Sequence, residues 1–380
     1  MKLLDPFKKI NKETSVDWKR SFGQYFVVFS DIHVSKKRKS QQSRALDLMR
    51  NVTEDWDKNI KRYLSDDKFR GILLVGDITH TGCSEEFELF NELYLKAIMQ
   101  IFNATKEEVF AVPGNHDLNR TVLSKSYYSH KKEHPVKIKD YYKRIEFGSN
   151  EGNIWNKSNN NRFKSYDEWL KKTTTITSRD NMVAGPWGKT LNGENKPITI
   201  AGINSAIASS GFVPRKCIEG CLNLFGRSHP KNHWVSSSQI YAALGEKKSE
   251  NTTLLMMHHS LDDFDSIETG SSICALNELA DIYLHGHHHV LNAEDKSEIS
   301  PIRISAPSFG NPNVKKNSKS NVNHRDSYAI IRIEGNELQI FYRTNLPPQI
   351  DSKYGFQGKN GASFVPDYCF NIKKDNLGGQ

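Results

Sequence analysis

Five short motifs that combine acidic, amide and imidazole side chains follow one another along this 380-residue chain. They are Ser30-Asp31-Ile32-His33, Gly76-Asp77-Ile78-Thr79-His80, Gly114-Asn115-His116-Asp117, His258-His259 and Gly286-His287-His288-His289. Carboxylate, amide and imidazole groups are the ligands that a pair of divalent transition-metal ions requires. Such a pair activates a water molecule and holds both the attacking and the leaving oxygens of a phosphoryl displacement. Taken together, the motifs therefore indicate hydrolysis of a phosphoester.

Each motif follows a short run rich in β-branched, aliphatic and aromatic residues, which is the pattern of a buried strand. These runs cover residues 25–29, 72–75, 109–112, 252–257 and 281–284. Open α/β sheets bind their ligands at the carboxyl ends of the strands. We therefore expect the five motifs to converge at the carboxyl ends of one open sheet.

The segments between the motifs predict the scaffold. Apolar residues spaced three or four apart over residues 41–64 predict a helix that returns over the sheet. Residues 84–102 predict a second helix of the same kind. A second set of strands is expected at residues 198–203, 302–305, 328–333 and 338–342. The last two are joined at Glu334-Gly335-Asn336 in the manner of a hairpin.

On its five motifs, the chain resembles the calcineurin-like metallophosphoesterases over residues 25–344. Within that superfamily it is similar to the cyclic-nucleotide phosphodiesterase and repair-nuclease branches. The resemblance implies an α/β fold, a four-layer αββα sandwich with helices outside two sheets, here carrying an inserted, mostly helical cap. We expect an N-terminal extension over residues 1–20, a metallophosphoesterase domain over 21–345 with the cap at 120–190, and a C-terminal tail over 346–380.

The resemblance also implies that the motifs hold two divalent metal ions. The implied ligands of the first ion are Asp31, His33, Asp77 and His289. Asp77 bridges to the second ion, whose other implied ligands are Asn115, His258 and His287. Manganese is the expected metal, with iron, zinc, cobalt, nickel and magnesium as alternatives.

Three histidines of the motifs need a more specific interpretation. The resemblance makes His116 the acid that protonates the leaving oxygen and Asp117 the group that orients its ring. His258 and His259 are neighbours, and neighbouring side chains on an extended chain point in opposite directions, so only one should face the metals. We prefer His258, the first polar residue after the apolar strand, and His259 stays open as the alternative.

Residues 120–186 follow directly after the third motif and form the expected cap. From residue 120 to residue 172 there are 13 Lys+Arg against 6 Asp+Glu, a balance of +7, whereas the whole chain has +9. Aromatic residues are interleaved with these cations, a combination used by grooves that bind single-stranded nucleic acid. The candidate substrate-binding residues are Arg120, Lys36, Lys37 and Arg38. The alternative is a solvated charged face whose aromatic residues form the small core of the cap.

The resulting hypothesis is a metal-dependent phosphoric ester hydrolase. It would hydrolyse phosphodiester bonds of a nucleic acid or nucleotide by attack of a metal-bridging hydroxide. One alternative is a small-molecule cyclic-nucleotide phosphodiesterase or a phosphomonoesterase, and a second is a non-catalytic binding module on the same fold. All seven implied ligands are present. Because a degenerate binding module would have lost at least one of them, the sequence favours an enzyme.

Cysteine content and the N-terminal residues indicate the compartment. Five cysteines are too few for a disulfide scaffold in a chain of this length and agree with a reducing compartment. The spacing of Cys217, Cys221, His229 and His233 could form a tetrahedral zinc site. We prefer the interpretation that the two cysteines are small buried residues of an extended segment. Residues 1–20 contain no continuous apolar stretch, so we expect a cytoplasmic protein without a membrane partner.

Overall fold

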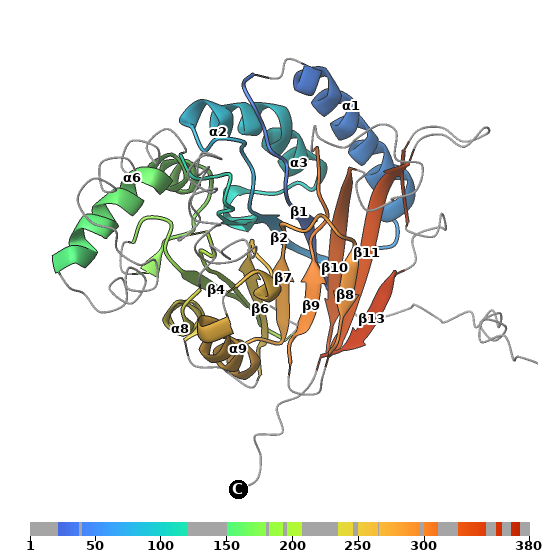
Figure 1. Ribbon diagram of the computed structural model, residues 1–380. Helices are drawn as coiled ribbons and strands as arrows, with labels where there is room; N and C mark the ends of the chain where they lie inside the picture. Colours follow the sequence, from blue (N-terminus) through green and yellow to red (C-terminus); the bar gives the residue numbers. More distant parts are fainter. Residues whose placement is uncertain are drawn as a thin grey trace, which may run out of the picture.

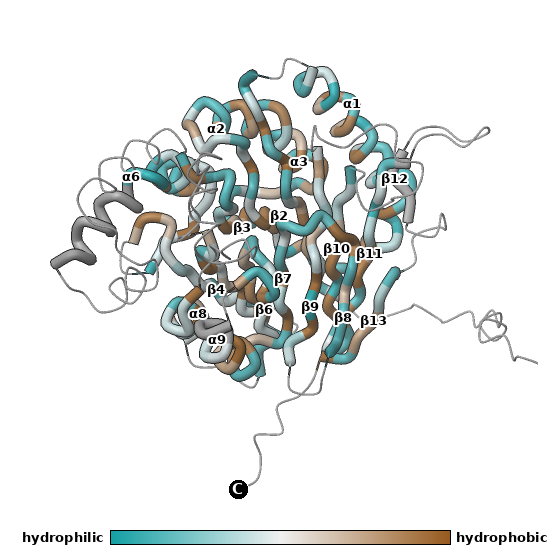
Figure 2. Tube along the Cα trace, in the orientation of Figure 1, coloured by the Kyte–Doolittle hydropathy of each residue, from teal (hydrophilic) through white to brown (hydrophobic). Residues whose placement is uncertain are grey.

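The computed structural model describes most of the chain, and all structural statements below concern these residues. They are 22–37, 40–119, 150–179, 182–192, 196–206, 235–245, 250–264, 266–296, 300–310, 326–346, 355–358 and 366–372. Two sheets lie face to face, with helices on the outside of each (Figure 1). Hydrophobic residues are most frequent along the strands between the helical layers (Figure 2).

The first sheet carries three of the five motifs. Its strand order is β12-β11-β10-β1-β2-β3, with β13 paired to β11. Its strands are β1 (Gln24–Phe29), β2 (Lys68–Val75), β3 (Val109–Val112), β10 (Ser327–Glu334), β11 (Glu337–Leu346), β12 (Gly355–Gly358) and β13 (Tyr368–Asn371). Strands β1, β2 and β3 run parallel, so the motifs that follow them leave the sheet at the same edge. β10 and β11 form the expected hairpin, in which Glu334 pairs with Glu337.

The second sheet carries the other two motifs, after β6 and β7. Its strand order is β4-β5-β6-β7-β9-β8. Its strands are β4 (Trp187–Leu191), β5 (Ile198–Gly202), β6 (Thr252–Met257), β7 (Ile282–His285), β8 (Asn292–Glu294) and β9 (Ile302–Ser305).

Two expectations about sheet membership are therefore wrong. The five motifs are divided between two sheets instead of ending on one. The strands expected at residues 328–333 and 338–342 join the first sheet, where β10 pairs with β1. The apolar pattern of a segment predicts a strand, but its neighbours are chosen by pairing with residues that are distant in the sequence.

Alternate residues of β6 pack on opposite faces of the second sheet and so show how the layers are arranged. Leu254 and Met256 belong to the same apolar cluster as Phe26 of β1, between the two sheets. Leu255 and Met257 belong to a second cluster, with residues of α8 (Ser237–Leu244) and α9 (Ser266–Leu279). The helices of the first sheet lie on its other side (Figure 1). The chain thus forms the expected four-layer αββα sandwich.

The two helices expected over the first sheet each contain a π-helical turn, at the end of the first helix and in the middle of the second. The first is α1 (Ser40–Asp55), which continues as η1 (Trp56–Ile60). The second consists of α2 (Ser84–Phe90), the π-helical η2 (Asn91–Leu95) and α3 (Lys96–Ile101). Short 3₁₀ turns lie at η3 (Lys106–Glu108) and η5 (Leu261–Asp263). No helix among the described residues is long and apolar enough to cross a membrane.

Helix α6 (Asn150–Thr173) belongs to the expected cap and packs on α2. Phe163, Tyr166 and Trp169 are buried. The ring of Trp169 stacks on Phe87 at a centroid distance of 5.3 Å, and its Nε1 donates a hydrogen bond to Oδ1 of Asn91 at 2.9 Å. These three aromatic residues of the cap therefore form its contact with the domain and are not exposed for stacking on bases.

A buried ion pair attaches the end of α1 to the first sheet. The carboxylate of Asp55 accepts hydrogen bonds from Nε of Arg343 at 2.9 Å and from the hydroxyl of Tyr328 at 2.6 Å. The side chains of Asp55 and Arg343 are 1% and 4% exposed. A charge without its partner is strongly unfavourable at such a position.

We expect Arg343→Leu to lower the free energy of unfolding by about 3–5 kcal/mol, because it leaves the carboxylate of Asp55 buried without a counter-charge. Urea unfolding followed by circular dichroism measures this loss. Arg50→Leu is the matched control, since Arg50 pairs with Asp47 at 3.1 Å but both side chains are about two-thirds exposed. It should cost less than about 1 kcal/mol. Equal losses in the two variants would contradict the prediction.

Candidate metal centre

The loops that follow β1, β2, β6 and β7 bring the acidic and imidazole groups of four motifs into contact. Nε2 of His289 lies 3.0 Å from Oδ1 of Asp31. Oδ2 of Asp77 lies 3.6 Å from Nε2 of His33 and 3.4 Å from Nε2 of His258. One carboxylate oxygen thus faces imidazoles from both implied ligand sets, which is the position that a bridging ligand requires.

The backbone of these loops adopts conformations that are uncommon for residues with side chains. Seven non-glycine residues have positive φ among the residues described, and five of them are implied ligands. These five are Asp31, His33, Asp77, His287 and His289, with φ between 51° and 70°. Such conformations cost free energy and cluster at functional sites. In this structure, these backbone conformations turn the ligands of one motif, such as Asp31 and His33, toward the same centre.

Glycines precede the ligands because ligand groups fill the space beside them. A Cβ on Gly114 would lie 2.2 Å from Oδ1 of Asp77. A Cβ on Gly286 would lie 2.4 Å from Oγ of Ser30 and 3.0 Å from Oδ2 of Asp31. A larger residue at Gly114 would displace the carboxylate of Asp77, and one at Gly286 would first displace the hydroxyl of Ser30.

The donor set fits divalent metal ions. Among the described residues, four groups of side chains could hold an ion. Two contain only implied ligands, namely Asp31, His33 and His289, and Asp31, Asp77 and His258. The third contains His258, His259 and His287, and the fourth contains His33, His80 and His116. Nδ1 of His258 lies 2.8 Å from the carbonyl oxygen of Val75, so Nδ1 is the donor in that hydrogen bond. Its buried Nε2 faces Oδ2 of Asp77 at 3.4 Å. A ring nitrogen held in this way is typical of a metal-binding histidine.

His258 and His259 have different polar neighbours. Nε2 of His258 lies 3.4 Å from Asp77, whereas Nε2 of His259 lies 3.1 Å from Oδ1 of Asn115. The two rings do not point in opposite directions, as their centroids are 4.8 Å apart and both lie near His287. The alternation expected of an extended chain does not apply because β6 ends at Met257.

Electrostatics keep the two carboxylates ionised. Burial raises the pKa of Asp31, but the charges of His258 and His289 outweigh burial and lower it to about 2. The pKa of Asp77 is likewise held well below its usual range, against burial, by His258 and His116. Burial lowers the pKa of His258, but Asp77 and Asp31 reverse this effect and raise it to about 10. In the metal-free protein, a proton on His258 therefore compensates part of the buried negative charge.

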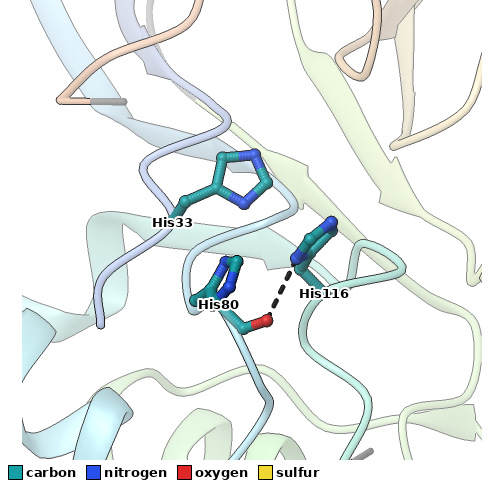
Figure 3. Close-up of side chains that lie close together, drawn as sticks. All are labelled: His33, His80 and His116. Carbon is teal, nitrogen blue, oxygen red and sulfur yellow. Dashed lines mark hydrogen bonds between the residues drawn. The ribbon is translucent and has the colours of Figure 1, made fainter. Parts of the chain in front are cut away.

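His116 lies beside the ligand His33, with ring centroids 4.5 Å apart (Figure 3). Its Nδ1 lies 3.0 Å from the main-chain oxygen of His80, and its main-chain N–H donates to Oδ1 of Asp77 at 2.7 Å. A carbonyl oxygen only accepts, so Nδ1 carries a proton and Nε2 is the nitrogen that can exchange a proton with a substrate. His80 was not among the implied site residues. It acts here through its main-chain oxygen, and the identity of a side chain does not predict what the main-chain oxygen of that residue will contact.

Asp117 does not have the position that the resemblance implies. Its buried carboxylate accepts hydrogen bonds from the main-chain N–H groups of Gly114 and Thr79, both at 2.9 Å, and from that of Ile78 at 3.3 Å. Burial and the charge of Asp77 raise its pKa to about 7. Asp117 therefore fixes the loops that carry Asp77 and Asn115, while the oxygen of His80 fixes the ring of His116.

The implied substrate-binding residues are only partly within the described chain. Nζ of Lys36 lies 3.3 Å from Oε1 of Glu85, and both side chains are about half exposed. Lys37 is exposed. Arg38 and Arg120 lie outside the described residues, as do Cys217, Cys221, His229 and His233.

Comparison with protein families matches residues 25–291, more than half of the chain, to the calcineurin-like phosphoesterases. The chain belongs to this family. The calcineurin-like phosphoesterase described here has no match among curated proteins.

Several solved structures are similar to the chain. GAP50 of Plasmodium is 14% identical, with a TM-score of 0.44 over 94% of this chain and 91% of that chain. The phosphopantetheinyl hydrolase of Mycobacterium tuberculosis is 14% identical, with a TM-score of 0.37 over 75% and 90%. Vps29 of Cryptosporidium parvum is 12% identical, with a TM-score of 0.33 over 92% and 100%.

Metal binding should release protons, because a metal ion must displace the proton that Asp77 and Asp31 hold on His258. At pH 7 we expect release of about one proton from His258, and an affinity that rises about tenfold per pH unit below its raised pKa. Calorimetric titration with Mn²⁺ in two buffers of different ionisation enthalpy measures the release. His258→Gln, which has no such proton, should release about one proton fewer. Equal release by both proteins would contradict the electrostatic argument.

Proposed function

We propose that this protein is a two-metal-dependent phosphodiesterase acting on a nucleic acid or nucleotide. The observation that carries the proposal is the position of Asp77, whose Oδ2 lies within 4 Å of both His33 and His258. A buried carboxylate between two sets of imidazoles is suited to hold two cations. The family supports a phosphoester hydrolase in general.

The residues divide into those that hold metal and those that handle protons. When bound, two divalent ions would supply an activated water and stabilise the charge that develops on a phosphoryl group. The residues that would hold them are Asp31, His33, Asp77, Asn115, His258, His287 and His289. His116 would donate a proton from Nε2 to the leaving oxygen, with its ring oriented by the oxygen of His80.

The preference for a phosphodiester rests on the motifs, which resemble those of the cyclic-nucleotide phosphodiesterase and repair-nuclease branches. A polynucleotide substrate has weaker support. Phe163, Tyr166 and Trp169 of the cap are buried, and Lys36 is paired with Glu85. These observations favour a small cyclic nucleotide as the second candidate substrate.

Removal of metal tests the proposed activity. Protein treated with a chelator should lose hydrolysis of bis(p-nitrophenyl) phosphate and regain it with Mn²⁺, because the nucleophile requires the metals. Asp77→Asn should abolish the activity and weaken binding of both ions. Full activity in chelator or in Asp77→Asn would exclude the two-metal hypothesis, and metal binding without any hydrolysis would favour a binding module.

Substitution of His116 tests the proton donor. His116→Ala should lose on the order of 10²–10⁴-fold in kcat on a diester with a poor leaving group, because that oxygen must be protonated as it departs. The loss should be much smaller for a p-nitrophenolate leaving group, and Mn²⁺ binding should be unchanged. Loss of metal, or an equal loss with every leaving group, would be incompatible with this role.

Charge reversal at the basic segment tests the substrate class. If Lys36 and Lys37 contact a polynucleotide backbone, changing both to Glu should weaken binding of single-stranded DNA and lower the salt dependence. Each phosphate contact contributes roughly −0.7 to −0.9 to the slope of log K against log salt. Lys58→Glu with Lys61→Glu is the matched control, since both lysines are exposed and paired with acidic residues of their own helical segment. No difference between the two double variants would favour the small cyclic nucleotide.

A further inference from the structure

We infer that Ser205 and His259 form a hydrogen-bonded relay that orients Asn115 as a ligand of the second metal ion, an inference that rests on the proposed metal-dependent function. His259 would then be a positioning residue and not a ligand. The relay connects the loop after β5 to the loop after β6 and reaches the loop after β3.

The three side chains are joined end to end. Oγ of Ser205 lies 3.0 Å from Nδ1 of His259. Nε2 of His259 lies 3.1 Å from Oδ1 of Asn115. Ser205 and His259 are both fully buried. Neither the hydroxyl nor the ring is therefore placed to act on a substrate directly.

The hydrogen-bonding capacity of each atom assigns the protons. An amide oxygen only accepts, so Nε2 of His259 must donate to Asn115. In a neutral ring Nδ1 is then the acceptor, and the hydroxyl of Ser205 donates to it. The Ser205 oxygen also accepts the main-chain N–H of His259 at 3.0 Å. Donor and acceptor capacities of Ser205 are thus both used, and this holds the ring in one tautomer.

The relay is fixed to the second sheet. The hydroxyl of Tyr283 in β7 donates to the main-chain oxygen of His259 at 2.8 Å. The neighbour of Ser205, Asn204, donates from Nδ2 to the oxygen of Ala184 at 3.1 Å, and its main-chain N–H donates to Oε1 of Gln239 at 3.2 Å. Ser205 and His259 are therefore held in place and cannot readily shift if the amide of Asn115 moves.

An orienting group is needed because the amide of Asn115 is an uncharged ligand. Carboxylates are drawn to a cation by charge, but an amide binds through one oxygen whose direction depends on rotation of the side chain. A hydrogen bond to one lone pair of Oδ1 leaves the second lone pair available to a metal ion. Loss of a hydrogen-bonding partner behind a ligand typically lowers metal affinity 10–100-fold.

Binding of Mn²⁺ alone tests the relay. It is measured by calorimetry and by the electron paramagnetic resonance signal of a coupled pair of Mn²⁺ ions. In His259→Leu, the second ion should bind 10–100-fold more weakly and the pair signal should be lost at Mn²⁺ concentrations that saturate the wild type. His259→Gln places an amide N–H near the position of Nε2 and should recover most of the affinity. Ser205→Ala should also weaken the second ion. Ser272→Ala is the matched control, since it removes a buried hydroxyl of helix α9 that donates a hydrogen bond to the main-chain oxygen of Val235 at 2.7 Å.

The outcomes separate the relay from the proposed function. A wild-type protein that binds no Mn²⁺ would refute the metal-dependent function itself. Wild-type affinity in His259→Leu would overturn the relay. Equal loss in His259→Leu and His259→Gln, with normal binding in Ser205→Ala, would make His259 a direct ligand and also overturn it. Thermal unfolding of each variant identifies losses that come only from a damaged fold.

Discussion

The structure depends on the burial of two carboxylates side by side. The side chains of Asp31 and Asp77 are 0% and 3% exposed, and no arginine or lysine among the described residues forms an ion pair with either. Burying negative charge without compensation is strongly unfavourable, so positive charge must be supplied within the same volume. Imidazoles supply part of it, through the proton on His258 and the hydrogen bond from His289. Divalent ions would supply the remainder, which explains why these acids are retained in the interior of the molecule.

The two-sheet architecture makes this arrangement possible. Asp31 and Asp77 follow adjacent parallel strands of the first sheet, whereas His258 and His289 come from loops of the second. The acids and the groups that compensate them thus belong to different sheets. The acids and the imidazoles come into contact because the two sheets pack face to face. Left-handed backbone conformations at the ends of the strands then turn the side chains toward one another. The strain of these loops is therefore stored where the sheets meet at the site.

Groups outside the ligand set determine how the ligands point. Main-chain oxygens of Val75 and His80 orient the rings of His258 and His116. The carboxylate of Asp117 accepts hydrogen bonds from main-chain N–H groups of two loops, a structural use of a residue for which the resemblance implies orientation of the His116 ring. Beyond these, the buried side chains of Ser205 and His259 reach Asn115. In helix α6, Phe163, Tyr166 and Trp169 belong to the buried core, and the rings of Tyr166 and Trp169 pack against Phe87 of α2.

The sequence alone predicted the strands that precede the motifs, the central strands beside them, the helices over the first sheet and the fold class, because apolar periodicity and strand-end polar motifs are local signals. It did not predict the strands β4, β8, β12 and β13 or the helices α8 and α9. Ser205 could have been added by the same rule, as it follows β5 in the way that Asp31 follows β1. Only the tertiary structure decided which strands pair, since β10 joins β1 across about 300 residues of chain. It also decided that His258 and His259 share one side, that Asp117 holds a loop and that a carbonyl group orients His116. Backbone groups carry no signature in the sequence, and pairing between distant segments is settled by packing that no local pattern records.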